Sequence, residues 1–180
     1  MYKRQGLTNI LIFFLQESLN WTTKASSGTL VVVGIIAIIV QGGLIGPLVK
    51  QFGEMRLTLI GSGFILLACA LLITAPKENA TINIYSAVSF LAVGAGLITP
   101  TLRALISKKL DIDKQGSILS NLQGLQSLGG VLGIAMAGRV YDSFGPKSPF
   151  IAGSVILLFM IYLIAEGKSC LLYTSPSPRD

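Results

Sequence analysis

The amino-acid sequence predicts an all-α fold, a polytopic bundle of helices that lies in a membrane. Hydrophobic residues make up 52% of the 180 residues and charged residues only 12%, whereas a soluble domain carries about a quarter charged residues. The mean hydropathy is +0.72, and the apolar runs are longer than the core helices of a soluble domain. The few charged residues cannot form a water-facing surface.

The composition also disfavours several classes of function. The chain has no His, and its two Cys, Cys69 and Cys170, stand far apart in the sequence, so no metal-ligand or redox spacing is present. We therefore expect no cofactor and no metal. The formal net charge is +6, but the basic residues are spread over short gaps between apolar runs. Nucleic-acid binding needs them clustered on one soluble face, so we expect no nucleic-acid partner.

The two ends of the chain resemble translated DNA adapters. Residues 170–180 read CLLYTSPSPRD, and residues 1–5 read MYKRQ. Back-translation gives inverted copies of one element used in transposon-based sequencing libraries, as expected of a cloned or sequenced fragment. We exclude both segments from the fold and expect one membrane domain over residues 6–169.

A bilayer core requires about twenty mostly apolar residues per helix. Residues 7–17 begin with an apolar stretch that is too short to span, so we expect a partial leading helix there. Residues 28–49 form the first complete apolar run, interrupted only by Gln41. Residues 57–75 form the second, which ends at Pro76.

Three further runs complete the prediction of five membrane-spanning helices. Residues 84–106 contain Pro100 and Arg103 near their end. Residues 118–140 are rich in glycine and amides, and residues 149–165 form the last and shortest run. The connections between the runs are short, so the sequence predicts a single membrane domain with no linker.

Lysine and arginine residues in the gaps indicate the orientation, because cytoplasmic loops carry an excess of both. One alternate set of gaps holds seven of them: Lys50, Arg56, Arg103, Lys108, Lys109, Lys114 and Lys168. The other set holds four: Lys24, Lys77, Arg139 and Lys147. We therefore expect the first set to face the cytoplasm.

Glycines recur at helix-packing spacings within two of the runs. Gly42 and Gly46 form one Gly-x-x-x-Gly pair, and Gly129 and Gly133 form another. Each pair is followed by Phe-Gly, at residues 52–53 and 144–145, so the sequence favours an internal repeat, although a chance match in a glycine-rich chain is the alternative. Since close packing drives helix association in lipid, we expect these four glycines to face neighbouring helices.

The gap after the first complete run carries a motif. Residues 46–56 read GPLVKQFGEMR and resemble the Gly-x-Leu-x-Asp-Arg-x-Gly-Arg-Arg loop signature of the major facilitator superfamily. The match covers Gly46, Leu48, Gly53 and Arg56. Lys50 and Glu54 depart from the signature, as in the degenerate second copy of the C-terminal half.

The resemblance extends over nearly all of residues 6–169. Residues 96–100 (GLITP), Gln115-Gly116 and the amide-rich run are similar to drug/proton antiporters of the tetracycline-efflux kind. The resemblance implies the C-terminal half of a twelve-helix transporter, from the outer end of the seventh helix through the twelfth. It also implies a lipid bilayer, a missing N-terminal half and a small-molecule substrate as partners, and the bacterial inner (cytoplasmic) membrane as location.

Within this resemblance, the loop motif is a conformational-gating candidate. Gly46 lets two helices approach closely, Gly53 suits a tight turn, and Arg56 can bond a carboxylate or the last carbonyls of a neighbouring helix. The alternative is a plain two-helix turn that obeys the positive-inside rule.

Polar residues inside the apolar runs are candidates for a substrate cavity, because amides and hydroxyls in hydrocarbon are costly without a partner or water. The alternative is interhelical hydrogen bonding. The candidates are Gln41, Tyr85, Ser89, Gln123, Gln126 and Ser127.

The middles of the five runs contain no acidic residue. A carrier that exchanges protons needs a group that binds and releases H⁺ within the membrane, so any such group is expected in the missing half. The sequence also lacks the side chains of an intramembrane enzyme. We expect part of a proton-coupled efflux transporter for a small amphipathic compound. The open alternatives are an uncoupled or differently coupled facilitator of a sugar or metabolite, a channel subunit, or a non-transporting membrane scaffold.

Overall fold

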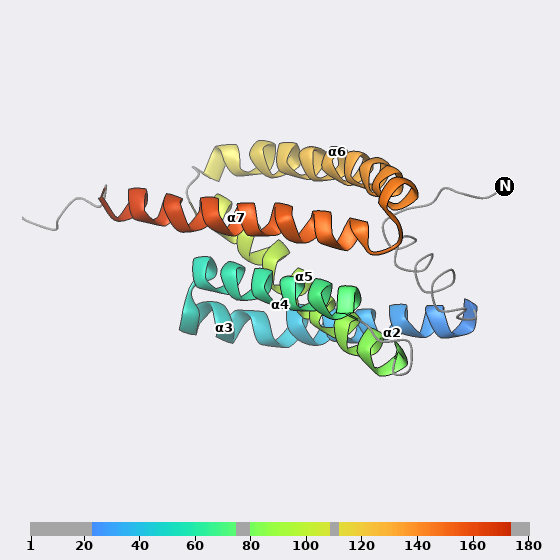
Figure 1. Ribbon diagram of the computed structural model, residues 1–180. Coiled ribbons are helices and arrows are strands. Elements are labelled where there is room, and N and C mark those ends of the chain that lie inside the picture. The colour runs from blue at the N-terminus through green and yellow to red at the C-terminus, as the bar shows by residue number, and fades with distance from the viewer. Residues whose placement is uncertain (1–22, 75–79, 109–111, 174–180) are drawn as a thin grey trace, which may run out of the picture.

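The computed structural model describes residues 23–74, 80–108 and 112–173, and all regular structure in these ranges is helical. The elements in chain order are α2 (Thr23–Ile39), η1 (Val40–Leu44), α3 (Ile45–Phe52), α4 (Glu54–Thr74), α5 (Ala80–Ser107), α6 (Ile112–Phe144) and α7 (Ser148–Tyr173). In Figure 1 the helices share one general direction, with α6 and α7 forming a pair beside the group of α2 to α5. The predicted all-α class is confirmed.

Three helical segments of the described chain are long and apolar enough to cross a membrane. They are Ser27–Phe52, Glu54–Thr74 and Thr81–Ser107, and they match the first three complete runs predicted from the sequence. A shorter apolar helix, Ser148–Ile164, matches the last predicted run. The chain is therefore an integral membrane protein by the length and composition of its helices.

The remaining predicted run lies in α6, which has 33 residues and is long enough to cross a bilayer. Amides such as Gln123 and Gln126 lower its hydropathy, so the described part of the chain supports three spans on length and composition. The partial helix predicted over residues 7–17 lies outside the described residues. The count of five complete spans stays a prediction.

The first span contains a short π-helical segment that the sequence analysis did not predict. The segment η1 includes Gly42 and Gly43, and Pro47 follows in α3. Proline has no N–H and its ring crowds the carbonyl four residues earlier, which here belongs to Gly43. Widening the helix at two residues without Cβ atoms relieves that clash, which is a physical reason for the π segment.

The core lies between α4 and α5, which run antiparallel and approach closely at two glycines. A Cβ atom placed on Gly94 would lie 2.6 Å from the backbone oxygen of Gly61 and 2.6 Å from Cγ1 of Ile65. Nearby, the buried hydroxyls of Thr58 and Thr101 are hydrogen-bonded at 3.0 Å. Small residues bring the two backbones together, and the threonine pair fixes their register.

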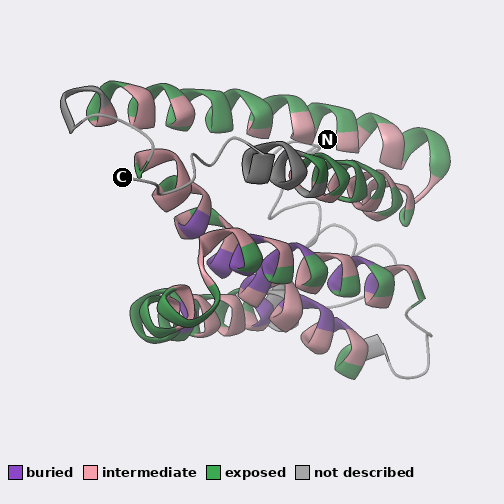
Figure 2. Ribbon diagram, turned by 90° about the vertical axis from the view of Figure 1, so that its left-hand side faces the viewer, coloured by how far each residue is buried: buried purple, intermediate pink, exposed green. Residues whose placement is uncertain are grey.

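Apolar side chains continue this contact toward the other end of the two helices. Leu72 of α4 packs with Ile84, Ala87 and Val88 of α5, and all four are fully buried. Buried residues gather on α4 and α5 (Figure 2), and the first span adds Thr29 and Val40. In α6 and α7 no described residue is buried.

The last two helices are joined by a tight turn. Gly145 adopts φ of +89°, a conformation that favours glycine. The single hydrogen of the Ser148 hydroxyl is shared between the carbonyl oxygens of Val140, 2.8 Å from Oγ, and Gly145, 2.6 Å from Oγ. The helix α7 then continues to Tyr173, beyond the predicted end at residue 165, because no proline or glycine pair interrupts it.

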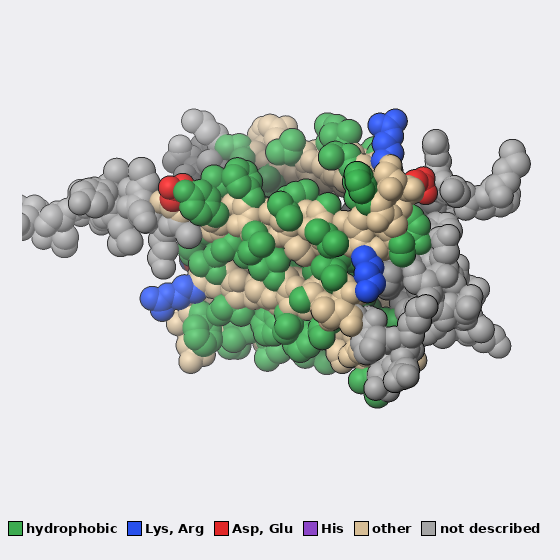
Figure 3. Space-filling model, in the orientation of Figure 1, with side chains coloured by type: hydrophobic (Ala, Val, Ile, Leu, Met, Phe, Trp, Pro, Cys, Tyr) green, Lys and Arg blue, Asp and Glu red, His purple; other side chains and the backbone are tan. Residues whose placement is uncertain are grey.

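The visible face of the molecule fits an environment that is apolar in the middle. In Figure 3 hydrophobic and uncharged side chains cover the central part of the face, and charged side chains lie toward the ends of the helices. Large hydrophobic side chains such as Leu125, Leu128 and Met136 of α6 are exposed. Lipid tails accommodate such surfaces, whereas water does not.

We expect Gly94→Ala to destabilise the protein by about 1–3 kcal/mol, because the new methyl group must push apart two backbones. The measurement is thermal unfolding of the protein purified in detergent micelles. Gly63→Ala is the matched control on α4, since a Cβ there meets nothing within 4 Å. Equal effects of the two substitutions would contradict the assigned contact.

Candidate functional site

A group of three polar side chains joins α5 to α6 in the described chain. Nη2 of Arg103 donates to Oε1 of Gln123 at 2.5 Å and, more weakly, to Oε1 of Gln126 at 3.4 Å. The two glutamines are three residues apart on α6, so their side chains are neighbours on the surface of that helix. All three side chains are exposed in this chain.

The sequence analysis identified both glutamines but missed their partner. The sequence analysis assigns Arg103 to the cytoplasmic cations because it lies near the end of the apolar run 84–106. The structure directs its guanidinium toward α6 instead. The sequence feature that could have indicated this contact is a cation at the edge of an apolar run, close to Pro100. Spacing within one helix does not show which other helix lies against that cation.

Two of the predicted hydroxyl groups are bonded within their own helices. Ser89 donates to the carbonyl oxygen of Tyr85 at 2.7 Å, and Ser127 donates to that of Gln123 at 3.0 Å. Such bonds to the carbonyl four residues earlier satisfy a hydroxyl in an apolar helix. The Tyr85 side chain lies against α2, where its hydroxyl is 3.1 Å from the Cβ position of Gly28.

Gln41 lies where η1 crosses α5. It is exposed, and its Cγ is 3.9 Å from the Cβ position of Gly96. Gly96 and Arg103 are seven residues apart and therefore share one face of α5. The three predicted amides thus border a common face of α5, whereas Tyr85 lies about 27 Å from Arg103 along the helix.

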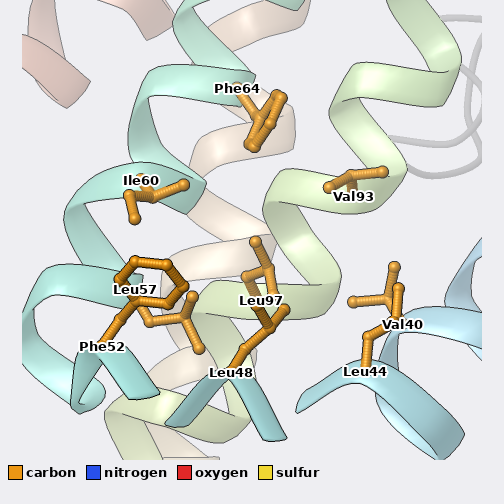
Figure 4. Close-up of a pocket in the computed structure, with 9 residues that line it drawn as sticks. All are labelled: Val40, Leu44, Leu48, Phe52, Leu57, Ile60, Phe64, Val93 and Leu97. Carbon is orange, nitrogen blue, oxygen red and sulfur yellow. The ribbon is translucent and has the colours of Figure 1, made fainter.

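A separate cavity of about 340 Å³ lies between the first span, α4 and α5. Figure 4 shows its lining, which consists of apolar side chains alone: Val40, Leu44, Leu48, Phe52, Leu57, Ile60, Phe64, Val93 and Leu97. Binding sites for polar molecules combine an apolar wall with a few placed polar groups. None of the predicted amides lines this cavity, so it is an apolar feature of the packing.

The loop motif forms a tight turn between α3 and α4. Gly53 adopts φ 75° and ψ 156°, a combination that essentially only glycine tolerates, and its N–H donates to the Val49 oxygen at 2.9 Å. Gly145 makes the equivalent bond to Tyr141 at 3.0 Å. The two Phe-Gly segments therefore end their helices in the same way, which supports the internal repeat.

The charges beside this turn include an ion pair that the sequence analysis did not predict. Glu54, the first residue of α4, forms an ion pair with Lys108 at the end of α5. Arg56 is exposed, and no carboxylate of the described residues pairs with it. The acid that replaces a basic residue of the signature thus holds α4 and α5 together, and a carboxylate partner for Arg56 stays a prediction.

The four glycines predicted to pack against neighbours have open space beside them. A Cβ on Gly42, Gly46, Gly129 or Gly133 would meet nothing within 4 Å. In the described bundle the close contacts are made by Gly61 and Gly94 instead. The predicted packing of the four glycines is thus not made among the described residues, and it stays a prediction for contacts with other segments.

These features define a polytopic helical membrane protein with amides on an uncovered face. The chain belongs to the Major Facilitator Superfamily, whose family model matches residues 4–134. Members of this superfamily are membrane transporters and not enzymes, so the resemblance read from the loop motif is confirmed, as is the expectation that the chain is not an enzyme.

The curated relatives include bacterial resistance proteins. The chain is 27% identical to "Tetracycline resistance protein, class C" of Escherichia coli over 87% of the chain and 39% of that protein. It is 27% identical to the class H protein of Pasteurella multocida over 74% of the chain and 32% of that protein. "Probable folate-biopterin transporter 7" of Arabidopsis thaliana is 26% identical over 76% of the chain and 33% of that protein.

The chain therefore spans less than two fifths of the length of these relatives. No solved structure matches it significantly. The likeness to tetracycline resistance proteins confirms the subfamily resemblance read from residues 96–100 and the amide-rich run.

We expect Gly53→Ala to lower stability by about 1–3 kcal/mol, because alanine is strained at this backbone conformation. Thermal unfolding in detergent micelles measures the effect. Gly46→Ala is the control, since it lies in the same motif with helical geometry and free space around its Cβ. A neutral Gly53→Ala would argue against the turn.

Proposed function

We propose that the chain is the C-terminal half of a secondary transporter that works by alternating access. The complete protein exports a small amphipathic compound in exchange for H⁺, from the cytoplasmic membrane of a bacterium. The names of the tetracycline resistance relatives support a drug-efflux role, and the folate-biopterin relative supports small-molecule transport more generally.

The observation that carries this proposal is the two-sided character of α6. Helical periodicity places Leu125, Leu128, Leu132 and Met136 on one face, and all are exposed. Gln123 and Gln126 project about half a turn away, with Gly130, Gly133 and Ala137 along the same side. Lipid can cover the leucine face, whereas amides in hydrocarbon require a protein partner or water.

Arg103 bonds the oxygens of both amides, while their N–H groups have no acceptor among the described residues. We therefore infer that this face lines a cavity or an interface that this chain does not complete alone. Transporters of this architecture place the substrate between two repeats, so one half supplies one wall. We propose that five helices of this chain span the bilayer behind a partial leading helix. The uncovered faces at Gly42, Gly46, Gly129 and Gly133 then pack against the missing half.

Proton coupling belongs outside the described spans on this proposal. The only acidic residue in the three candidate spans is Glu54, at the very start of α4 and paired with Lys108. A carboxylate that cycles between protonation states must reach the cavity, so the missing half supplies it. A facilitator that moves its substrate without protons is the second candidate, favoured by the same lack of a mid-span acid.

Reconstituted, full-length protein is expected to move its compound against a gradient when a pH difference is imposed. Alanine at Gln41, Gln123 or Gln126 should lower the transport rate about tenfold while membrane expression changes little, since a lost hydrogen bond to a bound compound weakens binding by that order. Uptake into proteoliposomes with and without the pH difference measures both effects.

The 180-residue chain alone serves as a control and should transport nothing. Transport by the chain alone would contradict the half-site argument. Transport that ignores the pH difference would favour the uncoupled facilitator.

Leucine at Gly46 or Gly133 is expected to abolish transport and leave the folding of this half intact. Within this chain the new side chain has open space around it, whereas in the complete protein it would clash with the second half. Gly34→Leu, on an exposed position of α2 with nothing within 4 Å, is the control. Wild-type transport by both variants would contradict the proposed contact.

A further inference from the structure

Arg103 carries a positive charge that no described residue neutralises. Among the described carboxylates, Glu54 pairs with Lys108, and neither Asp142 nor Glu166 forms an ion pair with Arg103. Its two partners are neutral amides, which accept hydrogen bonds without changing the net charge. Arginine stays protonated at every physiological pH, so among the described residues this charge has neutral partners alone.

The hydrogen bonds use only part of the guanidinium. Both hydrogen bonds start from Nη2, and Nη1 and Nε have no acceptor among the described residues. A guanidinium offers five N–H groups in a rigid plane, and an edge with two parallel donors fits a carboxylate or phosphate. The two amide oxygens fix the orientation of this plane and leave one edge available.

The two amides hold the guanidinium against α6, away from the ends of that helix. The helix α6 has 33 residues and is about 50 Å long. Gln123 lies eleven residues, about 16 Å, from the start of α6. A free arginine near a helix end extends toward water or lipid headgroups, whereas this one is bonded to the side of a neighbouring helix.

We propose that Arg103, oriented by Gln123 and Gln126, is an oxyanion-binding site that takes a carboxylate or phosphate group of the transported compound. This inference rests on the proposed transport function and narrows its substrate to amphipathic anions. The carboxamide nitrogens of the two glutamines supply further donors toward the same anion. Arg103 is the residue that contacts the anion, and the glutamines hold its guanidinium in place.

The experiment measures binding of small probes to the full-length protein in micelles of neutral detergent by titration calorimetry. The probes are benzoate and phenyl phosphate, with benzamide as the uncharged analogue of benzoate. We expect at least one anion to bind at least tenfold more tightly than benzamide. Arg103→Gln should weaken anion binding about tenfold or more, and Arg103→Lys should weaken it less, because lysine keeps the charge and loses the planar fork.

Two further variants make the result specific. Arg139→Gln removes an exposed cation of α6 that has no partner among the described residues, and it should leave anion binding unchanged. Gln123→Glu places a carboxylate against Arg103 without removing it and should abolish binding of the probes. If Arg103→Gln does not fold, this variant and Arg103→Lys still test whether Arg103 binds the anion.

Equal binding of anions by the wild type and Arg103→Gln would overturn the proposal, and so would the absence of anion binding or equal binding of benzamide. Competition by phosphatidylglycerol, with no competition by neutral lipid, would assign the site to lipid phosphate and also overturn it. A protein that transports a neutral compound under a pH difference, yet binds no anion, refutes this inference and leaves the proposed transport function standing.

Discussion

The close approach of α4 and α5 at Gly61 and Gly94 is the contact on which the described bundle depends. In lipid the hydrophobic effect does not drive helices together, so association relies on van der Waals contact and a few hydrogen bonds. The two glycines bring the backbones together, and the Thr58–Thr101 hydrogen bond then sets the register. The remaining elements pack around this pair, since the first span lies against α5 and α7 lies against α4.

The sequence predicted the helices well because hydropathy is a local property. A run such as residues 57–75 is helical in any bilayer, since no other open structure satisfies its backbone. It did not identify Gly61 and Gly94, which make the close contact of the described bundle, because spacing identifies a flat face but not its partner. Gly94 lacks a neighbour in a Gly-x-x-x-Gly pair, yet it makes the closest contact. The π segment depends on the combination of Gly43 with Pro47, which hydropathy does not register.

Because a sequence does not show which helices are neighbours, the predicted site also differs from the observed polar group. Gln123 and Gln126 were identifiable because amides in an apolar run are costly, and that cost is visible within one helix. Arg103 precedes Gln123 by twenty residues and lies on another helix. Its contact with the two glutamines is therefore a tertiary contact, which a single sequence does not predict. The hydroxyls of Ser89 and Ser127 were weaker candidates for a physical reason, since each bonds its own helix.

The amides also connect the fold to the site. Side-chain hydrogen bonds from α6 to α5 among the described residues occur at Arg103 and at the Ser107 carbonyl, which accepts from Gln115 at 3.1 Å. Both lie in the last turns of α5, and no described residue of α6 is buried. The position of α6 against α5 is therefore held near one end by polar contacts. Because those contacts include the guanidinium, whatever neutralises its charge also affects how firmly α6 is held.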